Sequence, residues 1–236
     1  MNLETREKLM KVTCATLTTA LFKRGLRNVF LQNVHPVAVK GHNMVGPAFT
    51  LRYVPAREDL NDITVFTNPK HPQRVAVEEC PKGSVLIMDS RGDARAASAG
   101  DILVARLMMR GGEGIVTDGG FRDSPAISKL DISAYHSRPS SPTNLILHQA
   151  IEVNGVIACG GVAVFPDDII VGDGEGVVVI PGELADEIAD EATKMTIFEN
   201  FVAQRVLGGQ SIVGLYPPTD PQTLVDFEQW KQDKSL

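Results

Sequence analysis

Residues 155–180 combine short apolar runs with closely spaced glycines, and this pattern restricts the possible folds more than any other part of the chain. The runs are rich in valine and isoleucine, which is typical of strands joined by tight turns. They occupy residues 155–159, 162–164, 169–171 and 176–180. Because no helical segment separates these strands, the pattern favours a compact, barrel-like sheet over a doubly wound nucleotide-binding fold.

The central part of the chain alternates predicted strands with predicted helices. Strands are expected at residues 46–54, 83–89 and 114–117, where apolar residues alternate or run without interruption. Helices are expected at residues 73–80 and 102–109. Together with the β-rich segment, this alternation predicts an α/β fold.

Helical patterns also lie near both ends of the sequence. Apolar residues at helical spacing predict one helix over residues 5–24 and an amphipathic helix over residues 184–207. The last part, residues 208–236, contains prolines and isolated aromatic residues and is expected to be a C-terminal docking extension. No repeat or linker divides the chain, so residues 1–236 are predicted to form a single domain.

The composition argues against several classes of partner. The net charge is −6 and no basic patch is visible, which disfavours nucleic acid as a ligand. The N-terminus is polar, and no run approaches the ~18 apolar residues of a membrane span. Cys14, Cys80 and Cys159 are far apart in apolar surroundings, so we expect buried, reduced thiols and a cytoplasmic protein without a membrane partner.

The sequence contains none of the common motifs for phosphate binding, nucleophilic catalysis or zinc binding. Residues 111–114 are rich in glycine but precede a strand, which is the wrong context for a phosphate-binding loop. Residues 172–176 are predicted to form a tight acidic turn between strands. No serine lies in a nucleophile elbow, and the histidines lack the spacing of a zinc site.

An Arg-Asp pair follows the Asp-Gly-Gly sequence that ends the predicted strand at residues 114–117. Residues 121–125 are expected to begin a helix. Arg122 offers a planar fork for a substrate carboxylate, and Asp123 offers an oxygen ligand to a hard cation such as Mg²⁺, which takes only one or two protein carboxylates. The structural alternative is a capping pair with a surface salt bridge.

A second predicted helix start lies at Gly100-Asp101-Ile102-Leu103. Its unpaired backbone N–H groups would form an anion site, unless Asp101 is only an ordinary N-terminal cap. A 2-oxo acid fits both helix starts, because its carboxylate can meet Arg122 and the N–H groups while its oxygens chelate an ion. The ion would then stabilise the enolate that forms when a carbon–carbon bond breaks.

Four segments carry a family resemblance that covers most of the chain. They are MVGPAFTLR (residues 44–52), GDIL (residues 100–103), GIVTDGGFRD (residues 114–123) and GVAVFPDDIIVGDGEGVVVIP (residues 161–181). In this order they resemble the family that contains the regulator of ribonuclease activity A and the class II 4-hydroxy-4-methyl-2-oxoglutarate/4-carboxy-4-hydroxy-2-oxoadipate aldolases.

The resemblance implies a β/β/α swivelling-domain-like fold, a sandwich with a compact barrel-like sheet and a C-terminal helical extension. It also implies a homotrimer or homohexamer with active sites at subunit boundaries. The aldolase members use Mg²⁺ or Mn²⁺ as cofactor in a retro-aldol cleavage of a 2-oxo acid that releases pyruvate, and they also decarboxylate oxaloacetate. The resemblance thus implies a metal-dependent lyase.

Residue roles follow by position from the same resemblance. Asp123 would bind the metal, Arg122 would bind and polarise the substrate, and the backbone of residues 100–103 would hold the pyruvate carboxylate. Asp101 would help to hold a water for proton transfer. Glu199 matches a glutamate that the aldolases contribute from a neighbouring subunit, or else it is a solvated helix residue.

Three further arginines, Arg52, Arg91 and Arg95, are candidates for recognising the distal part of the substrate, with ordinary surface positions as the alternative. The competing function is a non-catalytic regulator that binds and inhibits a ribonuclease complex. The presence of Asp101 and of the Arg122-Asp123 pair favours an enzyme. A methyltransferase is not supported, because no glycine-rich loop stands between a strand and a helix.

Overall fold

In the computed structural model, which describes residues 1–235, strand β2 (Met44–Pro55) runs through the main sheet. Its first half pairs antiparallel with β12, its central part pairs parallel with β3, and its last part pairs antiparallel with β9. The strand order is β1-β7-β5-β3-β2-β12-β13, with β9 joined to β2. The other strands of this sheet are β1 (His35–Pro36), β3 (Val85–Asp89), β5 (Gly114–Thr117), β7 (Ser133–His136), β9 (His148–Val153), β12 (Ile169–Gly172) and β13 (Val177–Ile180).

Several of these strands are buried on both faces, which explains their continuous apolar sequences. In β3, Leu86 and Met88 face one hydrophobic cluster, whereas Val85 and Ile87 face another. Ile170 of β12 lies in the second cluster, in the interior of the curved sheet, together with residues of β10 (Ile157–Cys159) and β11 (Val162–Val164). The mixed α/β architecture with a barrel-like sheet is therefore confirmed.

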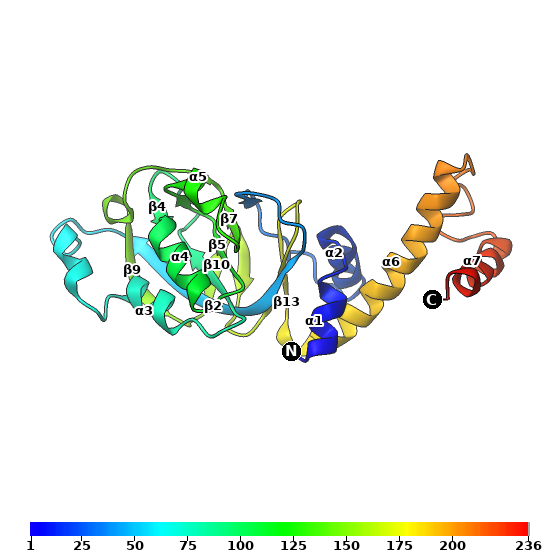
Figure 1. Cartoon of the computed structure of the whole chain (residues 1–236), viewed down its shortest axis with the longest axis horizontal. Coiled ribbons are helices and arrows are strands. Elements are labelled where there is room, and N and C mark those ends of the chain that lie inside the picture. Colours follow the sequence, from blue (N-terminus) through cyan, green and yellow to red (C-terminus); the bar gives the residue numbers. More distant parts are fainter. Residues whose placement is uncertain (236) are drawn as a thin grey trace.

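Helices α3 (Pro72–Glu79), α4 (Asp101–Met109) and α5 (Ser124–Ile127) cover one face of the sheet (Figure 1). Short 3-10 helices, η1 (Ile63–Thr67) and η2 (Asn144–Ile146), lie in the connections beside them. Near α4 and α5, a small parallel sheet is formed by β4 (Ala97–Ala99), β6 (Gly120–Phe121) and β8 (Arg138–Pro139).

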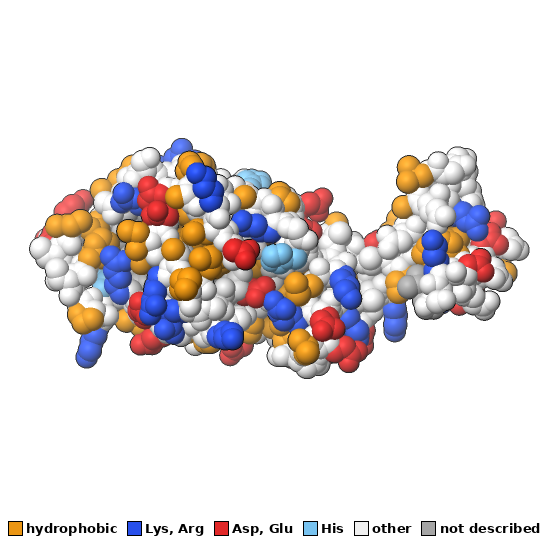
Figure 2. Space-filling view, viewed as in Figure 1, with side chains coloured by type: hydrophobic (Ala, Val, Ile, Leu, Met, Phe, Trp, Pro, Cys, Tyr) orange, Lys and Arg blue, Asp and Glu red, His pale blue; other side chains and the backbone are white. Residues whose placement is uncertain are grey.

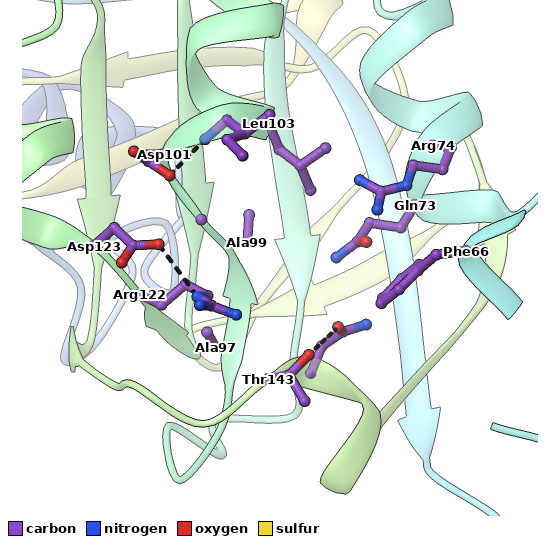
Figure 3. Close-up of a pocket in the computed structure, with 13 residues that line it drawn as sticks. Phe66, Gln73, Arg74, Ala97, Ala99, Asp101, Leu103, Arg122, Asp123 and Thr143 are labelled. Atoms are coloured by element: carbon purple, nitrogen blue, oxygen red, sulfur yellow. Dashed lines mark hydrogen bonds and ion pairs between the residues drawn. The ribbon is translucent and has the colours of Figure 1, made fainter. Parts of the chain in front are cut away.

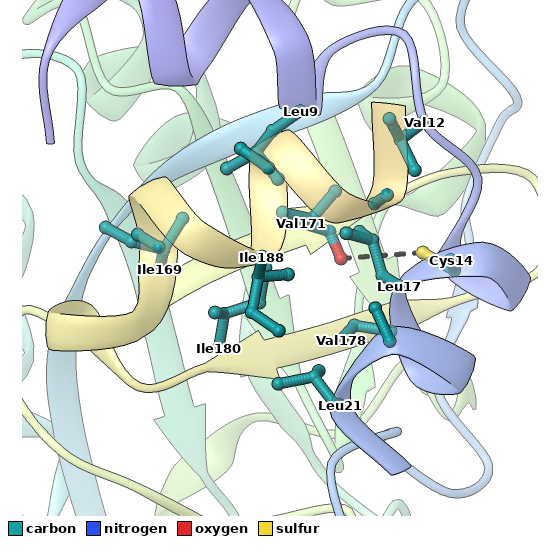
Figure 4. Close-up of a cluster of buried hydrophobic side chains, with 14 of the residues drawn as sticks. Leu9, Val12, Cys14, Leu17, Leu21, Ile169, Val171, Val178, Ile180 and Ile188 are labelled. Carbon is teal, nitrogen blue, oxygen red and sulfur yellow. Dashed lines mark hydrogen bonds between the residues drawn. The ribbon is translucent and has the colours of Figure 1, made fainter. Parts of the chain in front are cut away.

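The β12–β13 hairpin is covered by α1 (Leu3–Leu9), α2 (Cys14–Lys23) and the first half of α6 (Ala185–Leu207), which follows the 3-10 helix η3 (Gly182–Leu184). Figure 4 shows Leu17, Leu21 and Ile188 packed against the side chains of the hairpin. The prediction of one helix over residues 5–24 is wrong, because α1 ends at Leu9 and Thr13 caps a separate helix by accepting a hydrogen bond from the Thr16 N–H at 3.2 Å.

The second half of α6 leaves the body and meets α7 (Pro221–Lys234) (Figure 1). In Figure 2 these parts form a lobe joined to the body by a narrow neck. The ring of Phe227 lies edge-on to Phe198 with ring centres 5.0 Å apart, and Trp230 packs on Phe201 with ring centres 5.8 Å apart. These contacts hold α7 against α6.

Several smaller expectations can be compared with the structure. Cys14, Cys80 and Cys159 are free and buried, as expected. The acidic turn between β12 and β13 is confirmed, since the Asp173 N–H donates to the Gly176 carbonyl at 3.0 Å. The helix expected over residues 121–125 begins later, because Phe121 belongs to β6. Among residues 1–235 no helix has both the length and the apolar character needed to cross a bilayer.

Replacement of Ile188 by alanine tests the packing of α6 on the β12–β13 hairpin. The Ile188 side chain is fully buried, so Ile188→Ala should lower the free energy of unfolding by about 2–5 kcal/mol through lost burial and a residual cavity. Lys194→Ala, at an exposed position of the same helix, is the control and should change this free energy by less than about 0.5 kcal/mol. Urea unfolding followed by circular dichroism measures both, and equal small effects would contradict this packing.

Candidate active site

The two helix starts identified in the sequence lie side by side because the strands before them are paired. Strands β4 and β6 run parallel with Ala99 opposite Phe121, so Gly100 and Arg122 follow at the same edge. The Arg122 N–H donates to the Ala99 carbonyl at 3.1 Å, which continues the pairing past the strand ends. Residues about twenty positions apart in the sequence thereby share one edge of a sheet.

Gly100 permits a close approach between the two segments. A Cβ atom at this position would lie 2.9 Å from Cγ of Arg122 and 3.1 Å from Oδ2 of Asp123. Contacts this short would require the Arg122 and Asp123 side chains to move, so glycine at residue 100 allows their present arrangement. The benefit comes from the space that glycine leaves rather than from its backbone conformation.

The Arg122-Asp123 pair is joined at the mouth of a cavity. Nε of Arg122 donates to Oδ2 of Asp123 at 3.2 Å, and the two side chains are 49% and 43% exposed. Asp123 has a left-handed backbone with a φ of 57° and precedes α5, yet its side chain makes no capping hydrogen bond. The capping alternative for Asp123 is therefore wrong, although the salt bridge exists.

The first turn of α4 lies next to this pair (Figure 3). Asp101 accepts a hydrogen bond at Oδ1 from the Ile102 N–H at 2.8 Å, and Gly100 provides no side-chain cap. The N-terminus of a helix carries a partial positive charge from its unpaired N–H groups. Here the Ile102 and Leu103 N–H groups already have partners within the turn. An anion between α4 and Arg122 would therefore meet favourable charge from the guanidinium group and the helix dipole, and also the carboxylates of Asp101 and Asp123.

The cavity has a volume of about 210 Å³ and is bounded on its far side by η1 and α3. Figure 3 shows Arg122 and Arg74 on opposite sides, with Gln73 and Phe66 next to Arg74. The residues expected to bind the metal and the 2-oxo acid end of the substrate all line this cavity within the chain: Gly100, Asp101, Ile102, Leu103, Arg122 and Asp123. The Ile102 side chain is 79% exposed.

Glu199 lies elsewhere, on α6. Its Oε2 accepts a hydrogen bond from the Thr16 hydroxyl at 2.8 Å, and its Oε1 lies 3.4 Å from the Tyr216 hydroxyl. It therefore contacts α2 and the segment before α7, and it does not line the cavity of its own chain. Its action across a subunit boundary stays a prediction.

The structure does not bring Arg52, Arg91 and Arg95 to the cavity. Arg52 pairs with Glu152 at 2.8 Å, and Arg95 pairs with Asp93 at 2.7 Å. Arg91 donates to the Leu147 carbonyl at 2.8 Å. The cationic side chain that faces Arg122 is instead Arg74, which we did not predict.

The cavity also contains side chains that the sequence analysis missed. They are Phe66, Gln73, Arg74, Ala97, Ala99, Thr143 and Asn144. The nearest sequence signal was the predicted helix at residues 73–80, which begins in the structure with Pro72 at its first turn. Nothing in that pattern indicates that its first residues face a site built by segments further along the chain.

The donor set of the cavity fits a hard divalent cation. Within residues 1–235, the Asp123 carboxylate contacts Arg122 but accepts no capping hydrogen bond from the backbone, and Asp101 lies on the same cavity wall. Within residues 1–235, no three side chains of His, Cys, Asp or Glu gather to form a complete metal site. An ion that takes one or two protein carboxylates and fills its other positions with water and substrate oxygens agrees with both facts.

A buried stack of two rings supports the segment that bears Arg122. His136 stacks on Phe121 with ring centres 5.6 Å apart, and His136 is 6% exposed. Burial, with a smaller effect of nearby His35, lowers the pKa of His136 from 6.5 to about 4. The imidazole is therefore neutral at pH 7 and belongs to the apolar support of β6.

Known proteins resemble this chain in sequence and in fold. A family profile described as "RraA-like: Aldolase/RraA" matches residues 14–179, more than half of the chain. A protein of Halalkalibacterium halodurans named "Putative 4-hydroxy-4-methyl-2-oxoglutarate aldolase" is 32% identical over 139 residues, which cover 55% of this chain and 66% of that protein. The chain spans 66%, 32% and 64% of the lengths of three curated relatives.

Solved structures also match this chain. RraAS2 of Streptomyces coelicolor, described as an unusual member of the RNase ES inhibitor RraA protein family, has a TM-score of 0.75 and 30% identity and covers 87% of this chain and 98% of its own. An uncharacterized protein of Pseudomonas syringae pv. tomato has a TM-score of 0.76 at 24% identity, covers 90% of this chain and 96% of its own, and shows the fold alone.

The buried His136 should make stability depend on pH. Its pKa is lower in the folded than in the unfolded chain, so the unfolded chain binds more protons between pH 6.5 and about 4, and stability falls as the pH falls through this window. Between pH 7 and pH 5, wild type should lose about 1–2 kcal/mol more of its unfolding free energy than His136→Gln. Urea unfolding at both pH values measures this difference, and parallel losses in the two proteins would contradict it.

Proposed function

The chain belongs to the RraA-like family, Aldolase/RraA, and from this we propose that it is a divalent-metal-dependent lyase that cleaves a 2-oxo acid by a retro-aldol reaction and releases pyruvate. Decarboxylation of oxaloacetate would be a second activity, because it passes through the same pyruvate enolate. One observation carries the proposal: Arg122, Asp123 and Asp101 line the same cavity as the N-terminus of α4.

Arg122 is suited to bind the 2-oxo acid end of the substrate. Its Nε is engaged by Asp123, and within residues 1–235 its terminal nitrogens have no hydrogen-bond partner. A guanidinium group binds a carboxylate through two parallel hydrogen bonds, which fixes the orientation of the bound acid. The positive end of the α4 dipole would add favourable charge on the neighbouring side.

Asp123, with Asp101 beside it, would hold Mg²⁺ or Mn²⁺. The bound ion would supply a positive charge next to the 2-oxo group, where negative charge develops in the reaction. The salt bridge between Arg122 and Asp123 holds the two side chains together. A substrate carboxylate bound by Arg122 would therefore lie next to an ion bound by Asp123.

The reaction needs a proton acceptor and a proton donor. When the bond between C3 and C4 breaks, the 4-hydroxyl loses its proton and becomes a carbonyl, while the bonding electron pair remains on the pyruvate fragment as an enolate. Asp101, which lines the cavity, would accept that proton through a water and return one to C3. Glu199 would contribute only from a neighbouring copy of the chain.

A non-catalytic role is the second candidate. It is favoured by the similarity to RraAS2, whose family is described as RNase ES inhibitors, over 87% of this chain. In that case the chain would bind a ribonuclease complex as a homo-oligomer through its surface, and the side chains of the cavity would be dispensable. The two functions differ in what they require of Asp123.

Removal of the Asp123 carboxylate tests the lyase directly. Asp123→Asn should lower pyruvate release from 4-hydroxy-4-methyl-2-oxoglutarate and oxaloacetate about 100-fold or more, because the charge that holds the ion is lost. Release is followed with lactate dehydrogenase in Mg²⁺, in Mn²⁺ and with EDTA. Asp131→Asn, at an exposed position beyond α5, is the matched control and should keep full activity. Full activity of Asp123→Asn would show that Asp123 is not the metal ligand of a lyase.

The regulatory function predicts a different result for Asp123→Asn. A ribonuclease complex immobilised on a resin should then retain wild-type protein and Asp123→Asn equally, with or without EDTA, and neither protein should release pyruvate above the spontaneous rate. Metal-dependent pyruvate release together with no retention on the ribonuclease resin would exclude the regulator.

A further inference from the structure

Strand β4 contains an extra residue just before the start of α4. Ala97 and Ala99 pair with consecutive residues of β6, so Ser98 between them is inserted into the pairing. Both alanines line the cavity, whereas the Ser98 side chain is fully buried (Figure 3). An inserted residue of this kind forms a β-bulge, which bends a strand and re-aims the residues around it. This bulge lies two positions before Gly100, at the edge of the candidate active site.

The carbonyl of Ser98 accepts hydrogen bonds from two buried side chains. The Tyr53 hydroxyl donates to it at 2.9 Å and Nε2 of Gln73 donates to it at 2.7 Å. Burial raises the pKa of Tyr53, so the hydroxyl keeps the proton that it donates. Tyr53 belongs to β2 and Gln73 to α3, so these bonds tie the bulge to the main sheet and to the helix on the far side of the cavity.

The side chain of Ser98 is anchored separately, in a ring of three hydroxyl groups. Its Oγ lies 2.7 Å from Oγ of Ser90 and 2.7 Å from Oγ1 of Thr117, and the last two atoms lie 3.2 Å apart. All three residues are fully buried, and each hydroxyl can donate to the next one around the ring. Oγ1 of Thr117 also accepts a hydrogen bond from the Gly119 N–H at 2.9 Å, in the turn that leads to β6. The ring therefore joins the bulge to the segment that carries Arg122.

We propose that Tyr53 and Thr117 are positioning residues, which act through Ser98 to fix the distance between α4 and β6. This inference rests on the proposed function for the reaction that the distance serves, since α4 carries Asp101 and β6 leads into Arg122. Neither positioning residue lines the cavity, so each acts on the reaction through the backbone that it holds. In a reaction that depends on alignment, a shift of about 1 Å can lower the rate about 100-fold.

Removal of the Tyr53 hydroxyl tests the α4 side of this arrangement. Tyr53→Phe leaves Gln73 to hold the Ser98 carbonyl, so the protein should fold. With oxaloacetate and Mg²⁺, kcat for pyruvate release should fall about tenfold, while KM should change less than about twofold because the guanidinium that binds the substrate is retained. The matched control is Tyr135→Phe, because Tyr135 is also buried and its hydroxyl donates to the Asp173 carbonyl at 3.0 Å, between β12 and β13. This control should keep kcat within about twofold.

The exchange rate of the Arg122 N–H measures the same spacing without any catalysis. This N–H donates to the carbonyl of Ala99, the residue after Ser98. In hydrogen exchange followed by NMR, the Arg122 N–H of Tyr53→Phe should exchange about tenfold faster than in wild type, relative to the amides of β5. Tyr135→Phe should not show this difference. A general loss of stability would instead speed the exchange of both sets of amides.

Two substitutions of Thr117 separate its hydroxyl group from its methyl group. Thr117→Val keeps the shape but removes the acceptor of the Gly119 N–H, so kcat should fall about tenfold and the Arg122 N–H should exchange faster. Thr117→Ser keeps the hydroxyl and should retain kcat within about twofold, even though the loss of a buried methyl group lowers stability. Equal loss of kcat in the two variants would show that packing matters rather than the hydroxyl, and would overturn the role of Thr117.

The outcomes separate the positioning residues from the lyase. Lower kcat and faster Arg122 exchange in Tyr53→Phe, but not in Tyr135→Phe, support the inference. Equal effects in the two tyrosine variants, or unchanged Arg122 exchange in Tyr53→Phe, overturn it even if wild type releases pyruvate. If wild type releases no pyruvate, the lyase is rejected, and the Arg122 exchange rates of the Tyr53 and Thr117 variants alone decide whether these residues fix the spacing.

Discussion

The buried carboxylate of Asp118 is the interaction on which the geometry of the site depends. It accepts hydrogen bonds from the N–H groups of Ser90, Gly92 and Gly160 at 2.7, 2.9 and 3.2 Å, and so joins the loop after β3 and the turn between β10 and β11 to the end of β5. Burial raises the pKa of this carboxyl, and the N–H groups act in the opposite direction. Gly119 then passes so close to the Ser98 hydroxyl that a Cβ would lie 2.6 Å from it. The Asp-Gly-Gly sequence thus places β6 beside β4, and with it Arg122 and Asp123.

The fold was predictable where burial repeats along the sequence. Strand β13 is apolar at every position, and β3 at every position before its last residue, Asp89, because both faces are covered. Such runs can be recognised without a structure. Strand β4 was missed because its three residues, two alanines and a serine, carry no periodic signal. The break between α1 and α2 was missed for a different reason, since helical spacing of apolar residues continues across a Thr13 cap that depends on local hydrogen bonding.

The candidate site likewise contains residues that could be predicted from the sequence and residues that could not. Arg122, Asp123 and the start of α4 were recognisable because they stand at predicted helix starts and lie in segments that resemble a known family, although β4 and β6, the strands directly before them, were not predicted. Arg74 lies in α3 and Asn144 in η2, and these elements reach the cavity only through their packing in the folded chain. No local pattern encodes such a contact. Arg52, Arg91 and Arg95 had similar chemistry in the sequence, but partners in the folded chain engage them instead.

The groups that hold the fold together are distinct from those that would perform chemistry. Asp118, Gly119 and the Phe121–His136 stack are buried, whereas Arg122 and Asp123 are about half exposed and joined by a salt bridge of the kind that contributes little to stability. Substitution at Arg122 or Asp123 would therefore leave the scaffold intact. This separation gives a physical reason why one fold family can include proteins named as aldolases and proteins described as ribonuclease inhibitors. Function in this family has to be argued from the few exposed residues at the ends of β4 and β6, because the same scaffold is compatible with an aldolase and with a ribonuclease inhibitor.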